Sequence, residues 1–283
     1  MLINSDSLSS CFVITLKIRS LMKKKILYLL TCVGLCWSSC TNEVDEFIGN
    51  VEPSTRSVST ALNANLASLF TGGAPTLTSA EIKEVNDAYA KMTSINCYRN
   101  IDEAVRNKTS YAGTIFLDDT YASAYFRKGS LAFPPYGILA SSMEHEFIHM
   151  YQRDVQGKKV DTDKEKRDTG MMEFELAFYQ GIIRYIHAGY SWTFKGEDGD
   201  PSYQSLWTSG LTDPSLIPQY EREFQTYVAS ICANGKPTSI DINEFVKWSN
   251  IFGEYSRGYS GKGYKFGNYD YGTSCINSLL KLY

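Results

Sequence analysis

The stretch that decides the fold is His145-Glu146-Phe147-Ile148-His149, in which two histidines stand four residues apart. On an α-helix this spacing puts both imidazoles on one face, one turn apart, so both can bind a single metal ion. Glu146 projects beside them and can take a proton from a water at such an ion. The chain has three histidines, and two of them lie in this pentapeptide. We therefore predict a metal-binding helix over about 138–153, the alternative being a solvated helix face with two unrelated histidines.

A catalytic zinc ion needs a third protein ligand and an open coordination position. Glu173 and Glu175 follow on the next predicted helix, over about 171–188. They point about 200° apart, so only one should reach the metal. We prefer Glu173, because its face carries small residues that would let this helix approach the motif helix closely: Gly170, Ala177 and Gly181. Glu175 shares its side with apolar residues, and it could instead support a ligand histidine from behind.

Apolar runs, capping residues and turn residues predict both strands and further helices around the motif helix. Apolar runs at 114–117 and 124–133 predict three short strands, the last two joined by a turn at 127–130. Thr78-Ser79-Ala80-Glu81 is a capping box and predicts a helix behind it. Asp213-Pro214 and Asp241-Ile242-Asn243-Glu244 predict two later helix starts. A small mixed sheet and the motif helix, followed by a mainly helical C-terminal part, favour the α+β class.

The first forty residues predict export. Lys23-Lys24-Lys25 precede an apolar run, 26–37, and then Ser38-Ser39-Cys40, which is the anatomy of a secretory signal. The run is too short to span a membrane comfortably. Ser38-Ser39-Cys40 resembles the lipobox of bacterial lipoproteins in the loose form seen in Bacteroidetes, which implies lipidation of Cys40. A signal cleaved elsewhere, or a retained anchor, is the alternative.

These features divide the chain into four parts. Residues 1–21 are expected to be an extension from a misassigned start codon, because Met22 opens the signal peptide, 22–39. Residues 40–60 are expected to form a lipidated polar tether, and residues 61–283 a single domain. The acidic residues after Cys40 resemble the surface-export signal of Bacteroidetes lipoproteins, although a plain solvated tether would look the same. We therefore expect a protein of the cell envelope, lipid-anchored to the outer membrane.

The charge composition of the chain excludes some classes of binding partner. The formal net charge is −3, and residues 1–39 are net basic, so the remainder is more acidic than the whole. An acidic body argues against nonspecific nucleic-acid binding and against electrostatic docking on anionic lipid. We expect no nucleic acid, and membrane contact through the lipid anchor only. Three cysteines follow Cys40 in the sequence: Cys97, Cys232 and Cys275. An exported protein could form one disulfide among them, and the sequence does not determine which two would pair. The oligomeric state is also left open.

Residues about 111–190 resemble the core of a gluzincin-type zinc metallopeptidase. The Glu-Phe-Glu segment at 173–175 resembles the third-ligand helix of that clan, and Met150-Tyr151-Gln152 resembles metallopeptidase lipoproteins of gut Bacteroidetes. The resemblance implies a zincin-like domain with Zn2+, a glutamate base and an edge strand that binds substrate in extended form. The hairpin ending at Leu131-Ala132-Phe133 is the candidate for that strand, and a plain core hairpin is the alternative.

Three functions fit these observations. The first is a zinc endopeptidase acting on a protein or peptide substrate, with His145, His149 and Glu173 as metal ligands and Glu146 as catalytic base. The second is a non-catalytic surface lipoprotein that binds glycan or host protein, with a vestigial metal site. The third is a zinc hydrolase of non-peptide amides. An oxyanion stabiliser is expected without a preferred candidate. The Tyr- and Gly-rich stretch 253–272 is read as a hairpin or irregular loop in preference to a sugar-stacking surface.

Overall fold

The computed structural model describes residues 61–158, 166–187, 212–256 and 259–283. The expected extension, signal peptide, Cys40 and tether lie outside these residues. In the part of the chain that is described, no helix has the length and apolar character needed to cross a membrane. Cys97, Cys232 and Cys275 are free thiols, so the disulfide that the compartment would permit is not formed among them.

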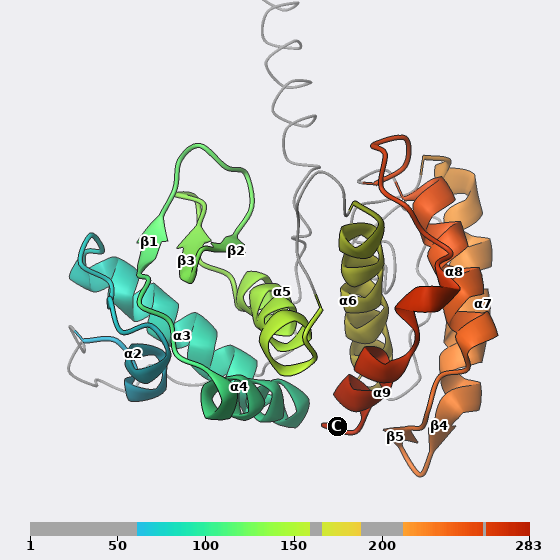
Figure 1. Cartoon of the computed structure of the whole chain (residues 1–283), viewed down its shortest axis with the longest axis horizontal. Helices are drawn as coiled ribbons and strands as arrows, with labels where there is room; N and C mark the ends of the chain where they lie inside the picture. Colours follow the sequence, from blue (N-terminus) through green and yellow to red (C-terminus); the bar gives the residue numbers. More distant parts are fainter. Residues whose placement is uncertain (1–60, 159–165, 188–211, 257–258) are drawn as a thin grey trace, which may run out of the picture. The chain divides into compact units, whose positions relative to one another are not determined.

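The first half of the domain combines helices with a small sheet (Figure 1). Helices α2 (Ala64–Leu69), α3 (Ser79–Ser94) and α4 (Asn96–Lys108) precede strands β1 (Ile115–Leu117), β2 (Tyr125–Arg127) and β3 (Ser130–Phe133). The strand order is β1-β3-β2, with β1 parallel and β2 antiparallel to β3. The predicted capping box at the start of α3 is present, because Thr78 and Glu81 each accept a hydrogen bond from the other's backbone N–H.

The sheet order corrects one expectation. The segment Leu131-Ala132-Phe133 belongs to β3, which lies in the middle of the sheet, with β1 and β2 on its two sides. It therefore has no free edge to offer a substrate. Its hairpin partner β2 pairs with β3 alone within this sheet and lies at an edge. The hairpin prediction is right, but the candidate edge strand is β2.

Helix α5 (Ala140–Met150) carries the motif and continues into a π-helical turn, Tyr151–Val155. Its buried apolar side chains anchor it against the neighbouring helices: Met143, Phe147, Ile148 and Met150. The ring of Phe147 lies 6.2 Å from that of Tyr89 in α3. Because one side of α5 is held in the core in this way, the histidines on its other side are fixed in direction.

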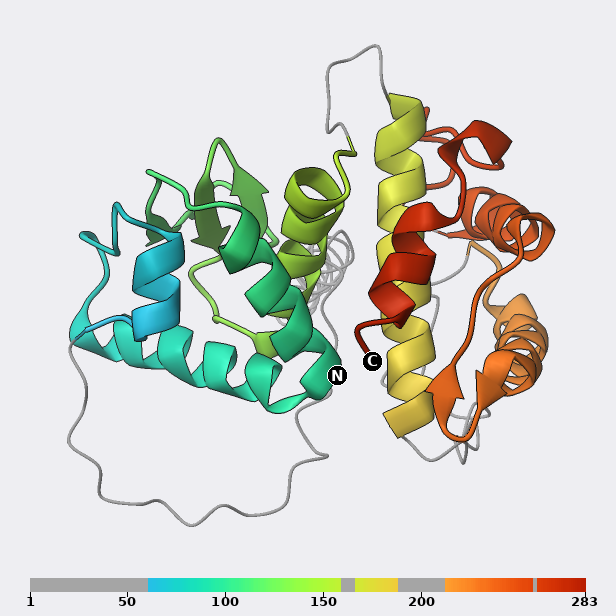
Figure 2. The same ribbon diagram turned by 60° about the horizontal axis from the view of Figure 1, so that its bottom comes forward.

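Helix α6 (Lys166–His187) is the central element of the second half. It contacts α5, α7 (Ile217–Ile231), α8 (Ile242–Tyr255) and α9 (Ser274–Leu280), and Figures 1 and 2 show it between α5 and the later helices. Among the residues that the structure describes, the remaining elements are a short hairpin, β4 (Cys232–Ala233) with β5 (Lys236–Pro237), and two 3₁₀ turns, Pro214–Leu216 and Tyr269–Tyr271. Asp241 caps α8 as predicted, by accepting from the Asn243 backbone N–H. The α+β class is confirmed.

An aromatic cluster holds α6 to the later helices. Phe178 of α6 is fully buried, and its ring centroid lies 5.5 Å from that of Phe224 in α7 and 5.8 Å from that of Phe245 in α8. Phe174, one turn earlier, packs at a tilt of 55° against Phe245 and Phe252, with ring centroids 5.0 Å and 5.6 Å away. Each buried ring contributes about 1.5–3 kcal/mol from desolvation alone. This packing fixes the rotation of α6, and with it the directions of Glu173 and Glu175.

Candidate metal centre

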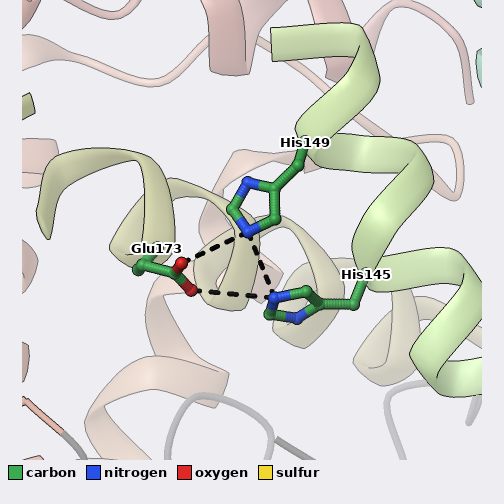
Figure 3. A group of neighbouring side chains, drawn as sticks. All are labelled: His145, His149 and Glu173. Atoms are coloured by element: carbon green, nitrogen blue, oxygen red, sulfur yellow. Dashed lines mark hydrogen bonds and ion pairs between the residues drawn. The ribbon is translucent and has the colours of Figure 1, made fainter. Parts of the chain in front are cut away.

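His145 and His149 lie on one face of α5, as the motif spacing predicts. Their Nε2 atoms are 3.1 Å apart, and the ring planes are nearly perpendicular, at 79°. Glu173 reaches them from α6, as Figure 3 shows. Its Oε1 lies 3.3 Å from His149 Nε2 and its Oε2 lies 3.7 Å from His145 Nε2. Three possible ligand atoms from two helices therefore converge on one point.

The spacing of these atoms fits a metal site. Donor atoms held tetrahedrally at about 2.0–2.1 Å from an ion are roughly 3.3 Å from one another. The Nε2–Nε2 separation of 3.1 Å and the 3.3 Å from His149 Nε2 to Glu173 Oε1 lie close to that value, and the 3.7 Å from His145 Nε2 is measured to the other carboxylate oxygen, Oε2. Two imidazoles and one carboxylate are also the donor set of a known class of catalytic zinc sites. The group of His145, His149 and Glu173 could therefore hold a metal ion.

The two histidines of the motif differ in the direction in which their pKa is shifted. Burial, together with the charge of neighbouring His149, lowers the pKa of His145 to about 4, although the charge of Glu173 acts in the other direction. Burial also lowers the pKa of His149, but the charge of Glu173 and its hydrogen bond outweigh burial and raise the pKa overall. The pKa of Glu173 is correspondingly low, because its attraction to His149 overcomes its own burial. Without a metal, the protein thus holds a His149–Glu173 ion pair beside a neutral His145.

Glu146 lies between the metal-ligand group and the sheet. Its side chain is buried, and burial raises the pKa to about 7, although the charge of His149 and a backbone hydrogen bond from Phe126 act in the other direction. Phe126 belongs to β2, and α5 contacts this strand. The edge strand of the sheet is therefore joined directly to the proposed catalytic base. A carboxylate whose pKa lies near neutrality suits proton transfer in both directions.

Glu175 does not join the three converging residues. It is fully buried, and its Oε2 accepts a hydrogen bond from Gln152 Nε2 at 2.8 Å. Gln152 lies in the π-helical turn, and its Oε1 is 2.8 Å from His149 Nδ1. Glu175 is thus linked to the ligand histidine through one intervening amide, on the side of the ring away from Glu173. Of the two glutamates left open by the sequence, Glu173 lies at the histidines and Glu175 lies behind them.

Two tyrosines from the C-terminal stretch complete the surroundings. Tyr259 donates to Glu173 Oε2 at 2.9 Å, and Tyr271 donates to Glu175 Oε2 at 2.8 Å. Sequence reasoning assigned no role to either, because both are among 20 tyrosines and lie 86 and 96 residues from their partners. Residues 253–255 are the end of α8, and the rest of the described part consists of turns, irregular backbone and the 3₁₀ helix Tyr269–Tyr271, so the irregular-loop interpretation is the better one beyond α8.

Gly170 also has a different neighbour from the one expected. A side chain added there would bring a Cβ to within 2.8 Å of the Lys265 carbonyl oxygen and 3.1 Å of Tyr264. The missing side chain therefore allows the C-terminal stretch to approach α6, whereas the sequence argument had assigned that space to α5. Because Tyr259 and Tyr271 lie in the same stretch, this close approach supports the hydrogen bonds to both glutamates.

Fold and site together define an α+β protein with a His–His–Glu group that could hold a metal ion. Comparisons with models of protein families, with curated proteins and with solved structures found no match.

Proposed function

We propose that this protein is a zinc-dependent hydrolase that cleaves peptide bonds. The observation that carries the proposal is the approach of Glu173, from a separate helix, to both histidines of the motif, beside Glu146. A chance pair of histidines on a solvated face would not have a carboxylate from another element within 3.3–3.7 Å of both rings. The zinc ion follows from the donor set, and the peptide substrate from the resemblance of the motif segment to gluzincins.

Zinc would supply a Lewis acid that polarises a water and a substrate carbonyl. The protein's own contribution begins with Glu146, which takes a proton from the attacking water and later passes it to the leaving amine. A nearby cation lowers the pKa of this carboxyl below its metal-free value of about 7, so Glu146 is a base at neutral pH. The backbone N–H of Phe126 holds the carboxylate in position during both transfers.

Tyr259 is the best-placed donor for the developing oxyanion. Its hydroxyl is 2.9 Å from Glu173 Oε2, at the edge of the ligand group, and it is partly exposed to solvent. Because its single O–H already donates to Glu173, Tyr259 would stabilise negative charge on the substrate once that hydrogen bond is released. The edge strand β2 is the candidate to receive the substrate backbone by strand addition, with its Phe126 N–H already donating to Glu146. A substrate held there would have its scissile bond near Glu146.

We further propose that the enzyme acts at the cell envelope. The basic and apolar run before Ser38-Ser39-Cys40 supports export, and lipidation of Cys40 would hold residues 61–283 at the outer membrane through a polar tether. Mass spectrometry of the protein purified from membranes tests this directly. A diacylglycerol-modified N-terminal Cys40 is expected, and an unmodified N-terminus at another residue would contradict it.

The activity test compares two isosteric variants on one helix. Glu146→Gln removes the proposed base, whereas Glu144→Gln changes a neighbouring buried glutamate that lies beside Tyr98 and whose pKa burial also raises to about 7. With zinc and a peptide library, Glu146→Gln should lose activity and Glu144→Gln should keep it. Activity that survives Glu146→Gln would refute the mechanism. A zinc-loaded protein that cleaves no peptide would favour a non-peptide amide or the binding-lipoprotein alternative, which an amide-substrate screen separates.

A further inference from the structure

A buried chain of hydrogen bonds runs behind His149, away from Glu173. Tyr271 donates to Glu175 Oε2, and Gln152 Nε2 donates to the same oxygen at 2.8 Å. Gln152 Oε1 then faces His149 Nδ1 at 2.8 Å. Gln152 and Glu175 are fully buried, and Tyr271 is 6% exposed, so water does not compete for these contacts. The chain connects α6 and the C-terminal stretch to one histidine ring.

The chemistry of the partners fixes the direction of the Gln152 amide. Its Nε2 is 3.0 Å from the Met172 carbonyl oxygen and 2.8 Å from Glu175 Oε2, and both of these atoms accept hydrogen bonds. A reversed amide would place oxygen against two oxygens and would present N–H groups to the imidazole. The observed orientation is therefore the only one that satisfies all partners. Gln152 Oε1 then accepts from His149 Nδ1, so the lone pair of a neutral ring lies on Nε2, toward Glu173.

We propose that Gln152 and Glu175 are positioning residues that hold His149 in the metal-binding tautomer, with the proton on Nδ1. Tyr271 extends this restraint to the C-terminal stretch by fixing the Glu175 carboxylate. The π-helical turn contributes by carrying Gln152, and such turns are frequent at functional sites. The proposal rests on the metal-binding part of the proposed function and names what tunes that site.

The two ligand histidines are then unequal. Among the described residues, His145 Nδ1 is buried and has no hydrogen-bond partner, whereas His149 Nδ1 has Gln152. Hydrogen-bonded partners behind a ligand histidine change metal affinity by about 10- to 100-fold. Breaking the chain should therefore weaken metal binding through His149, while both rings and Glu173 remain in place.

The test measures zinc affinity of the full chain by competition with a chromogenic chelator at fixed pH. Gln152→Met keeps the side-chain length but removes the acceptor and the donor. Gln156→Met is its matched control, because Gln156 follows the same turn and its side chain contacts Tyr151 in place of the histidine. We expect a zinc Kd about 10- to 100-fold weaker for Gln152→Met. The control should stay within about twofold of the wild type, because Gln156 does not contact a ligand ring.

A rescue experiment and a spectrum keep the proposal testable if Gln152→Met folds poorly. Exchanging the two groups, Gln152→Glu with Glu175→Gln, keeps an acceptor for His149 and restores the donor between the helices that Gln152→Glu alone removes. Its Kd should lie closer to the wild type than that of Gln152→Glu alone. In ¹⁵N-edited NMR spectra of the zinc-loaded protein, the Nδ1–H of His149 should be visible in the wild type and the double variant, and lost in Gln152→Met.

The outcomes separate this inference from the proposed function. A wild type that binds zinc, with Gln152→Met and Gln156→Met equally tight, overturns the positioning role alone. A double variant as weak as Gln152→Glu, or a His149 whose proton lies on Nε2, also overturns it. A wild type that binds no zinc overturns both the site and its tuning. Weaker zinc binding in Gln152→Met and Gln152→Glu but not in Gln156→Met, with recovery in the double variant and the Nδ1–H signal, establishes the proposal.

Discussion

Replacing Glu173 by glutamine should lower the pKa of His149 by several units in the metal-free protein. Glu173 Oε1 and His149 Nε2 are 3.3 Å apart, and both side chains are largely buried. Two opposite charges at that distance attract by about 5 kcal/mol at an effective dielectric constant of about 20. One pKa unit corresponds to about 1.4 kcal/mol, so the loss amounts to roughly 3 to 4 units. The pKa of His149, about 9 in the wild type, should fall to about 5 to 6, because burial then outweighs the charge of Glu146 and the hydrogen bond with Gln152.

The assay is an NMR titration of the histidine ring protons after chelator treatment. With three histidines in the chain, a His149→Ala spectrum assigns the resonance. Glu175→Gln is the matched control, since Gln152 lies between Glu175 and the ring, and we expect a shift of less than about 1 unit there. A Glu173→Gln variant in which His149 still titrates near pH 9 would refute the ion pair and the placement of Glu173. Equal shifts in both variants would refute the distinction between the two glutamates.

Three further predictions follow from the same structure. Zinc affinity should rise close to tenfold per pH unit up to about pH 9 and then level off, because the ion must displace the proton that Glu173 stabilises on His149. A competition titration that finds no pH dependence would contradict this. Glu146→Gln should retain zinc but lose about 10²- to 10⁴-fold in kcat, and the wild-type kcat/KM should fall as the pH drops through the pKa of Glu146. Thr78→Ala should cost about 1 kcal/mol in urea unfolding by removing half of the α3 capping box, and an unchanged midpoint would show that the box does not stabilise the helix.

Local signals in the sequence predicted the elements whose ends are set by nearby side chains. The capping box at Thr78 and the cap at Asp241 act over two or three residues, so both could be read directly. The hairpin of β2 and β3 was likewise visible from its turn. Helix α4 has no side-chain cap at its start, so no capping signal marks it, although its buried residues Tyr98, Ile101 and Val105 recur at helical spacing. The parallel pairing of β1 with β3 is non-local, so the sequence did not reveal which strand lies at the edge.

The choice of metal ligands also depended on non-local packing that the sequence did not reveal. Helical periodicity placed Glu173 and Glu175 on different faces, but it did not determine which face turns toward α5. Small residues on one face of α6 favoured Glu173, but one of them, Gly170, borders Lys265 of the C-terminal stretch and not α5. The rotation of α6 is set by the packing of Phe174 and Phe178 against α7 and α8. Tyr259 and Tyr271 reach the site only through that tertiary arrangement.

The central claim is that His145, His149 and Glu173 hold one metal ion. Elemental analysis of the purified protein, after zinc is offered and the excess removed, tests it most directly beside His149→Ala and Glu173→Gln. The account predicts about one zinc per chain in the wild type and loss of bound zinc in both variants, with helical content unchanged by circular dichroism. A wild type without metal, or a His149→Ala variant that retains it, would contradict the account.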